Sequence, residues 1–225
     1  MHSNTKLLSD TSATANACTL YFLAKNPEIL RKLQRKLDDV MPRGAQDWSY
    51  EKVKSVTYLD DIINESMRLK PPVITGGYRV TPPEGMQVDE VYIPGDVNVF
   101  VPFELIQTDE RYWQQPLEFI PERWGERKVE MGTDETLFIP FSAGRKIHCG
   151  FHSTLTNISI GIYKCPGSVL AMMSMRTAIS SIVQQFDIKF APGETGELFD
   201  KDRKDVFTTV LHPLQLEFTL RSENI

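Results

Sequence analysis

The sequence is short of cysteine and of long apolar runs, and each shortage excludes a class of protein. Three cysteines in 225 residues, Cys18, Cys149 and Cys165, form an odd and sparse set. Such a set suits a reducing compartment or a metal ligand better than a disulfide framework. No stretch approaches the run of about 18 apolar residues that spans a bilayer, and the first residues lack the apolar core of a signal peptide. We therefore expect a soluble chain without disulfides or a membrane span.

Positive charge is scarce as well. The chain has 25 Lys and Arg against 30 Asp and Glu, a formal net charge of -5. A nucleic-acid surface neutralises phosphates with clustered Lys and Arg, and the only such cluster, residues 31–36, is expected to be the solvated face of a helix. We therefore expect no nucleic-acid partner.

What the sequence does contain predicts a mixed, mainly helical fold. Hydrophobic residues make up 41% and charged residues 24%, enough for one sizeable core or for a large piece of a bigger domain. Apolar spacings of three and four predict helices over residues 10–25, 27–41, 58–70 and 167–186. Turn residues separate short predicted strands at residues 76–80, 86–88, 91–102 and 206–220. In the last helix we expect these side chains to face inward: Leu170, Met173, Ile179, Ile182 and Phe186.

One pair of charges stands on the helix over residues 58–70. Glu65 and Arg68 are three residues apart, so their side chains share a face and can pair. Such a pair is ordinarily a weak surface contact. Arg123, in the Pro-Glu-Arg-Trp turn of FIPERW, could complete a buried triad with them if every donor finds an acceptor.

Four motifs now stand in one order: Glu-x-x-Arg in YLDDIINESMRLKPP, then FIPERW, FIPFSAGR and KCPGSVLAMM. In this order and at these spacings they resemble the C-terminal half of a cytochrome P450 of fungal type, a haem-thiolate monooxygenase. The resemblance runs from about Asp10 to the end, so residues 1–225 are expected to be a partial P450 domain, α+β and mainly helical with small β-sheets. It implies haem as cofactor, and a structural triad of Glu65, Arg68 and Arg123.

The resemblance also gives the first helix a role. Asp10 and Thr11 match the acid and alcohol that face the oxygen side of the haem, where a hydroxyl can hydrogen-bond bound dioxygen and a carboxylate can relay protons. The alternative is that either residue is an N-cap at the start of the helix. The small residues that the family places before the acid are replaced by Leu7 and Leu8. Residues 1–8 are therefore expected to be a false or truncated start.

Of the cysteines, Cys165 is the candidate iron ligand. A thiolate binds iron, and the N-terminus of a helix favours the anion; Cys165-Pro166-Gly167 leads into the last long helix, whereas no helix follows Cys149. In the family, a Phe and a Gly three residues later precede the Cys, which comes seven residues after the Phe. Phe141 and Gly144 match, but Cys165 lies too far along.

Removing seventeen residues, Lys146–Ile162 or Ile147–Tyr163, restores the family spacing. We therefore hypothesise that residues 146–163 are an insertion or a retained intron in the haem-binding loop. A real surface loop remains the alternative.

Two arginines are candidates for the haem carboxylates. Arg79, in GGYRV, falls where the family places an arginine that pairs with a propionate, and a guanidinium suits a carboxylate at a partly buried edge. Arg145 is the second candidate.

A zinc site is the alternative role for Cys165, because His148, Cys149, His152 and Cys165 could form a tetrahedral set of ligands. Their spacing fits no closed zinc finger well.

The expected function is that of a haem-dependent monooxygenase, which inserts one atom of dioxygen into a small organic substrate with electrons from an NADPH-dependent reductase. The alternative is a truncated, inactive P450 fragment that cannot hold haem. A full-length relative would lie at the endoplasmic reticulum membrane, whereas this chain, without an anchor, is expected in the cytosol.

Overall fold

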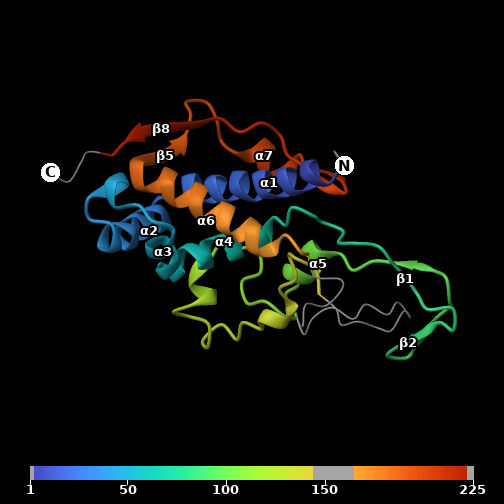
Figure 1. Ribbon diagram of the computed structural model, residues 1–225. Helices are drawn as coiled ribbons and strands as arrows, with labels where there is room; N and C mark the ends of the chain where they lie inside the picture. The colour runs from blue at the N-terminus through green and yellow to red at the C-terminus, as the bar shows by residue number, and fades with distance from the viewer. Residues whose placement is uncertain (1–2, 144–164, 222–225) are drawn as a thin grey trace.

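The computed structural model describes residues 3–143 and 165–221. Its long helices cross one another beneath a sheet near the C-terminus, and short strands extend from the opposite end (Figure 1). The helices are α1 Ser3–Lys25, α2 Pro27–Val40, α3 Tyr50–Ser55, α4 Thr57–Leu69, α5 Phe103–Gln107, α6 Ser168–Gln185 and α7 Glu197–Lys201, with 3₁₀ turns at η1 Gly44–Asp47, η2 Pro121–Trp124 and η3 Glu135–Leu137.

Strands form only small antiparallel pairs in this part of the chain. Strand β1 pairs with β4, β2 with β3, β5 with β8, and β6 with β7. Their bounds are β1 Arg79–Val80, β2 Met86–Val88, β3 Val91–Ile93, β4 Asn98–Val99, β5 Phe186–Phe190, β6 Lys204–Val206, β7 Thr208–Val210 and β8 Leu216–Leu220. The predicted fold class, mainly helical with small β-sheets, is confirmed.

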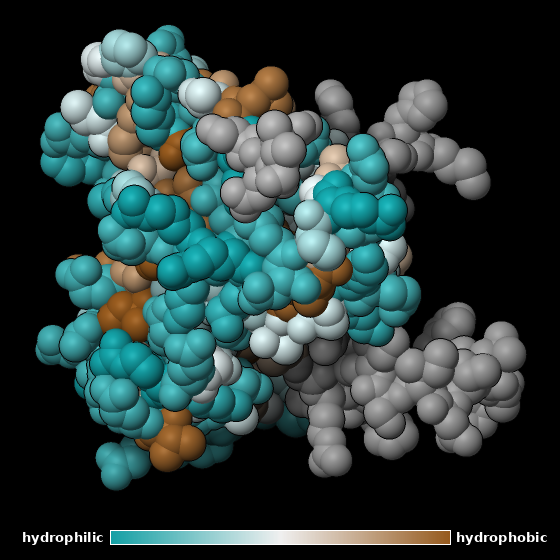
Figure 2. Space-filling model, turned by 90° about the vertical axis from the view of Figure 1, so that its left-hand side faces the viewer, coloured by the Kyte–Doolittle hydropathy of each residue, from teal (hydrophilic) through white to brown (hydrophobic). Residues whose placement is uncertain are grey.

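The core lies where α1, α2, α4 and α6 pack together. Leu33 and Leu37 of α2 are buried against Ile62 and Ile63 of α4, as the amphipathic spacing of both helices predicts. The end of the molecule that carries α2, α3 and the C-terminus is mainly hydrophilic, with small separate hydrophobic spots (Figure 2). No helix of residues 3–143 and 165–221 is long and apolar enough to cross a bilayer.

Two local predictions were wrong. Helix α1 begins at Ser3 and not at residue 10 as predicted, because the residues before Asp10 contain no Pro or Gly that would stop a helix. Asp10 and Thr11 therefore lie inside the helix, which rules out the N-cap alternative. In α6, Leu170 is 62% and Met173 40% exposed. The buried stripe runs through Met175, the predicted Ile179, and Val183; at about 100° per residue Leu170 lies opposite Ile179 and Met173 lies about 120° from it.

In the basic cluster of α2, Arg31 and Arg35 are exposed as predicted, whereas Lys32 is less solvated. Lys32 donates to Glu122 Oε1 and Glu126 Oε2, both at 2.9 Å, and its ammonium lies 4.5 Å from the ring centre of Tyr58. The Tyr58 hydroxyl donates to the same Glu122 oxygen at 2.7 Å. These contacts tie α2 and α4 to the η2 turn.

A second link between α4 and η2 is fully buried. Glu65, Arg68 and Arg123 are each 0% exposed. Glu65 Oε1 accepts from Arg123 Nε at 2.8 Å and Arg68 Nη2 at 2.9 Å, while Oε2 accepts from Arg68 Nε at 2.9 Å. Two donors of η2 and its approach, the Trp124 indole N–H and the Ile120 backbone N–H, reach the same carboxylate at 3.0 Å. The structure thus brings the three predicted triad residues together.

The remaining N–H groups of both arginines point to backbone carbonyls. Arg68 donates to the carbonyls of Gln107, Pro116 and Glu118 at 2.7–3.1 Å. Arg123 donates to those of Gln114 and Gln115 at 3.0–3.1 Å. Backbone carbonyls of the irregular segment between α5 and η2 therefore accept their hydrogen bonds from two buried side chains, Arg68 and Arg123, which Glu65 binds.

Replacing this carboxylate should be costly. We expect Glu65→Gln to lower the free energy of unfolding by about 3–5 kcal/mol, because it leaves two buried guanidinium groups without their counter-charge. Denaturant unfolding of the variant measures the loss. Glu28→Gln is the matched control, since Glu28 and Arg31 are also three apart but exposed, and it should cost less than about 1 kcal/mol. Similar losses in the two variants would contradict a structural role for the buried pair.

Asp61 should make the stability depend on pH. Burial, with the nearby carboxylates of Asp60 and Glu122, raises the pKa of Asp61 from 3.8 to about 6. A carboxyl whose pKa is higher in the folded than in the unfolded chain favours folding when protonated. Its contribution is therefore complete below about pH 4 and is lost as the pH rises through about 6.

We therefore expect Asp61→Asn, which is neutral at every pH, to raise the free energy of unfolding at about pH 7.5. The gain should be on the order of 1 kcal/mol, after allowance for solvent screening of this half-buried group, and should vanish near pH 4. Unfolding curves at the two pH values measure it. Asp109→Asn is the control, because hydrogen bonds from Arg111 lower the pKa of Asp109 and predict the opposite trend. An equal gain at both pH values for Asp61→Asn would show that titration is not its cause.

Candidate active site

A cavity of about 240 Å³ opens between the helices and the strand-bearing end of the molecule. Its wall is mostly apolar and comes from segments far apart in sequence: α1, α4, α5, α6, the chain around β1 and the β6–β7 turn. The lining residues that matter for chemistry are Thr11, Ser12, Arg79, Ser142 and Cys165. An apolar cavity with a few polar groups is the ordinary form of a small-molecule or cofactor site.

Cys165 reaches the cavity through a short turn before α6. Its backbone N–H donates to the carbonyl of Phe141 at 2.8 Å, and its carbonyl accepts from Ser168 N at 3.2 Å. Phe141 lines the same cavity. The thiol therefore lies close to the N-terminus of α6, where the field of the helix favours an anion.

Cys18 has the opposite environment. It lies in α1 at 1% exposure, and burial raises the pKa of its thiol to about 12, although Lys70 opposes the shift. A neutral buried thiol behaves as a small apolar side chain. Of the two cysteines in the described residues, only Cys165 lines the cavity.

The other predicted site residues divide between the cavity and its surroundings. Thr11 lines the cavity, whereas Asp10 is exposed and is not among the lining residues. Arg79, at the start of β1, also lines it and donates from Nη2 to Ser142 Oγ at 3.0 Å. Gly144 and Arg145 lie outside the described residues, as does the proposed insertion at 146–163.

The zinc alternative gains no support from the described part of the chain. Of its four ligands only Cys165 lies there, and residues 3–143 and 165–221 contain no group of three or more His, Cys, Asp or Glu placed to hold a metal ion.

The donor set of the cavity fits a haem. Cys165 offers one soft sulfur ligand, Arg79 offers a cation for a carboxylate, and the Thr11 and Ser12 hydroxyls stand on another element, α1. The remaining wall, with Ala171 and Met175 of α6, is apolar, as a flat macrocycle requires.

Several cavity residues were missed at the sequence level. Ser142 and Phe207 line the cavity with positive backbone φ, +63° and +81°, a conformation that non-glycine residues rarely adopt. Ser12 lies beside the predicted Thr11. Gly76 and Gly77, shortly before Arg79, were a usable sequence signal for a close approach of the backbone. No local sequence pattern indicates Phe207, which reaches the cavity only through the tertiary fold.

Comparison with known proteins gives the family of the chain. The sequence profile described as "Cytochrome P450" matches residues 9–150. Among curated proteins, cytochrome P450 monooxygenase eupD of Phoma sp. is 40% identical over 213 residues, which cover 95% of this chain and 67% of that protein. Cytochrome P450 monooxygenase orf5 of Eupenicillium brefeldianum is 39% identical over 215 residues, and tryprostatin B 6-hydroxylase of Aspergillus fumigatus is 31% identical over 213.

These matches cover 39% of orf5 and 35% of the Aspergillus protein, so the chain spans little more than a third of either relative's length. The profile over residues 9–150, together with the eupD match over 95% of this chain, shows that the chain belongs to the cytochrome P450 family.

Proposed function

We propose that the chain is the C-terminal part of a haem-dependent monooxygenase and that Cys165 is the iron ligand. The observation that carries the proposal is the meeting of Cys165, Arg79 and Thr11 at one apolar cavity from three separate elements. The family match supports haem as the cofactor of this cavity, and the place of the thiol beside a helix N-terminus supports Cys165 as its ligand.

Each residue then has a defined task. Cys165 would hold the iron through its sulfur, Arg79 would pair with a haem carboxylate, and Phe141 would pack against the ring. Haem bound to a thiolate supplies the oxygen chemistry, since the sulfur donates electron density that favours O–O cleavage. Thr11 Oγ1 would donate a hydrogen bond on the α1 side. Because Asp10 is exposed, its carboxylate can exchange protons with water and pass them toward Thr11.

The substrate and partners are proposed by analogy with the relatives. One of them is named as a hydroxylase of tryprostatin B, which supports hydroxylation of a small organic molecule. Electrons would come from an NADPH-dependent reductase. In a full-length protein the site would lie at the endoplasmic reticulum membrane.

We further propose that residues 146–163 interrupt the haem-binding loop. The backbone N–H of Cys165 donates to the carbonyl of Phe141 at 2.8 Å, so the two ends of the loop meet although they are far apart in sequence. A loop of ordinary family length would join them equally well. The family profile also ends inside this segment, at residue 150.

The iron ligand is tested by replacing each described cysteine in turn. We expect the chain to take up haem and, when reduced under carbon monoxide, to show the red-shifted Soret band of thiolate ligation. Cys165→Ala should abolish that band, because no other thiol lines the described cavity wall. Cys18→Ala, the control, should keep it. A band that survives Cys165→Ala would refute the assignment, and no haem uptake by the unchanged chain would favour the inactive-fragment alternative.

The insertion is tested by deletion. Removing Lys146–Ile162 restores the family spacing between Phe141 and Cys165 and should increase haem uptake, measured as bound haem per chain. Removing only Phe151–Ile160 shortens the loop without restoring the spacing and serves as the control. Equal uptake by the two deletions, or presence of the segment's codons in every mature transcript, would count against an insertion.

A further inference from the structure

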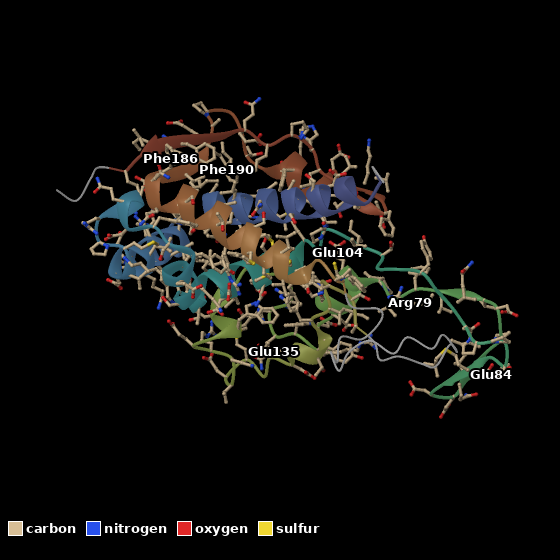
Figure 3. All side chains as sticks on the ribbon, in the orientation of Figure 1. Arg79, Glu84, Glu104, Glu135, Phe186 and Phe190 are labelled. Carbon is tan, nitrogen blue, oxygen red and sulfur yellow. The ribbon has the colours of Figure 1, made fainter. Side chains whose placement is uncertain are left out.

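The guanidinium of Arg79 is held by the carbonyl of Tyr78, just before β1, and by the hydroxyl of Ser142. Nη1 donates to the carbonyl of Tyr78 at 2.9 Å, and Nη2 donates to Ser142 Oγ at 3.0 Å. Figure 3 shows Arg79 where the strand-bearing end meets the body of helices. We call Gly77, Tyr78 and Ser142 the Arg79 cradle.

Gly77 makes room for this arrangement. A Cβ at Gly77 would lie 2.8 Å from Arg79 Nη1, closer than carbon and nitrogen can approach. The guanidinium therefore occupies space that a side chain at residue 77 would take.

Ser142 contributes its hydroxyl from a costly backbone conformation. Its φ is +63°, in the left-handed region that glycine and asparagine occupy more easily than serine. A residue kept in such a conformation is held there by its surroundings, and strain of this kind gathers at functional sites. At residue 142 the hydroxyl is the one group that glycine would not supply, and it contacts Arg79.

Ser142 also connects the two sides of the site. It follows Phe141, whose carbonyl accepts the Cys165 backbone N–H. Two consecutive residues thus contact the two groups: Phe141 holds the backbone of Cys165, and Ser142 holds the guanidinium of Arg79. A planar guanidinium recognises a carboxylate well only when its plane is fixed, because two parallel N–H groups must meet two oxygens.

Resting on the proposed function, we propose that Ser142 is a positioning residue that fixes Arg79 for a carboxylate of the haem. It acts through Arg79 and does not itself need to touch the cofactor. Loss of its hydroxyl should therefore weaken binding only of porphyrins that carry free carboxylates.

The test uses two porphyrins and two substitutions. Iron protoporphyrin IX and its dimethyl ester differ only in whether the carboxylates are free, and equilibrium titration followed by the Soret band gives the affinity of each. Ser142→Gly keeps the backbone conformation and removes the hydroxyl. It should weaken binding of the free acid about three- to tenfold, the usual effect of one lost hydrogen bond, and leave the ester unchanged. Ser142→Asn, which tolerates positive φ and restores an acceptor, should rescue the affinity.

A double-substitution experiment separates positioning from loop stability. In an Arg79→Gln background, Ser142→Gly should have no further effect on the free acid. Equal weakening of both porphyrins by Ser142→Gly, or no weakening of either, would overturn the positioning role while leaving the proposed function intact. If the unchanged chain bound neither porphyrin, the proposed function would fail and the inference with it.

Discussion

The rest of the structure depends on the carboxylate of Glu65. It is fully buried and is satisfied by two arginines, an indole N–H and a backbone N–H. A buried charge is tolerable only when all of its partners are in place, so the arrangement is all-or-none. The other N–H groups of the two arginines donate to backbone carbonyls between α5 and η2. These hydrogen bonds order a long irregular stretch that contains no helix or strand.

Hydrogen bonds extend this order to the cavity. Gln107, whose carbonyl accepts from Arg68, also donates from its amide to the carbonyls of Met67 and Arg68 at 3.2 Å. Its Oε1 accepts from the backbone N–H of Ile139 at 3.0 Å, and the Ile139 carbonyl in turn accepts from Ser142 N at 2.9 Å. The loop that supports Cys165 is thus connected to the buried ion cluster by one amide side chain. Disturbing the cluster should therefore displace the site as well as lower the stability.

The sequence predicted the parts of this molecule whose signals are local. Helices α2 and α4 have regular apolar stripes and proline at an end, and both were placed to within a residue or two. Helix α3 and strand β5 were missed because they are short, and their formation rests on packing against α6 and pairing with β8. The inward face of α6 was misjudged because Leu170 and Met173 are apolar, although the helical angle sets both well away from Ile179, the centre of the buried stripe.

The residues of the candidate site also differ in whether their signals are local or arise only from the tertiary fold. Cys165, Arg79 and the triad were proposed because each belongs to a short motif, whereas Ser142 and Phe207 have roles that exist only once distant segments meet. The cavity wall has no local sequence signature, because it is formed by segments that are separate in the sequence: α1, α4, α5, α6 and the β6–β7 turn. The two thiols also differ only through the tertiary fold. Burial raises the pKa of the Cys18 thiol to about 12, whereas Cys165 lies at a helix N-terminus beside the cavity. What distinguishes the proposed ligand from the inert side chain is its surroundings, and hydrogen bonds of Glu65, Gln107 and Phe141 hold those surroundings in place.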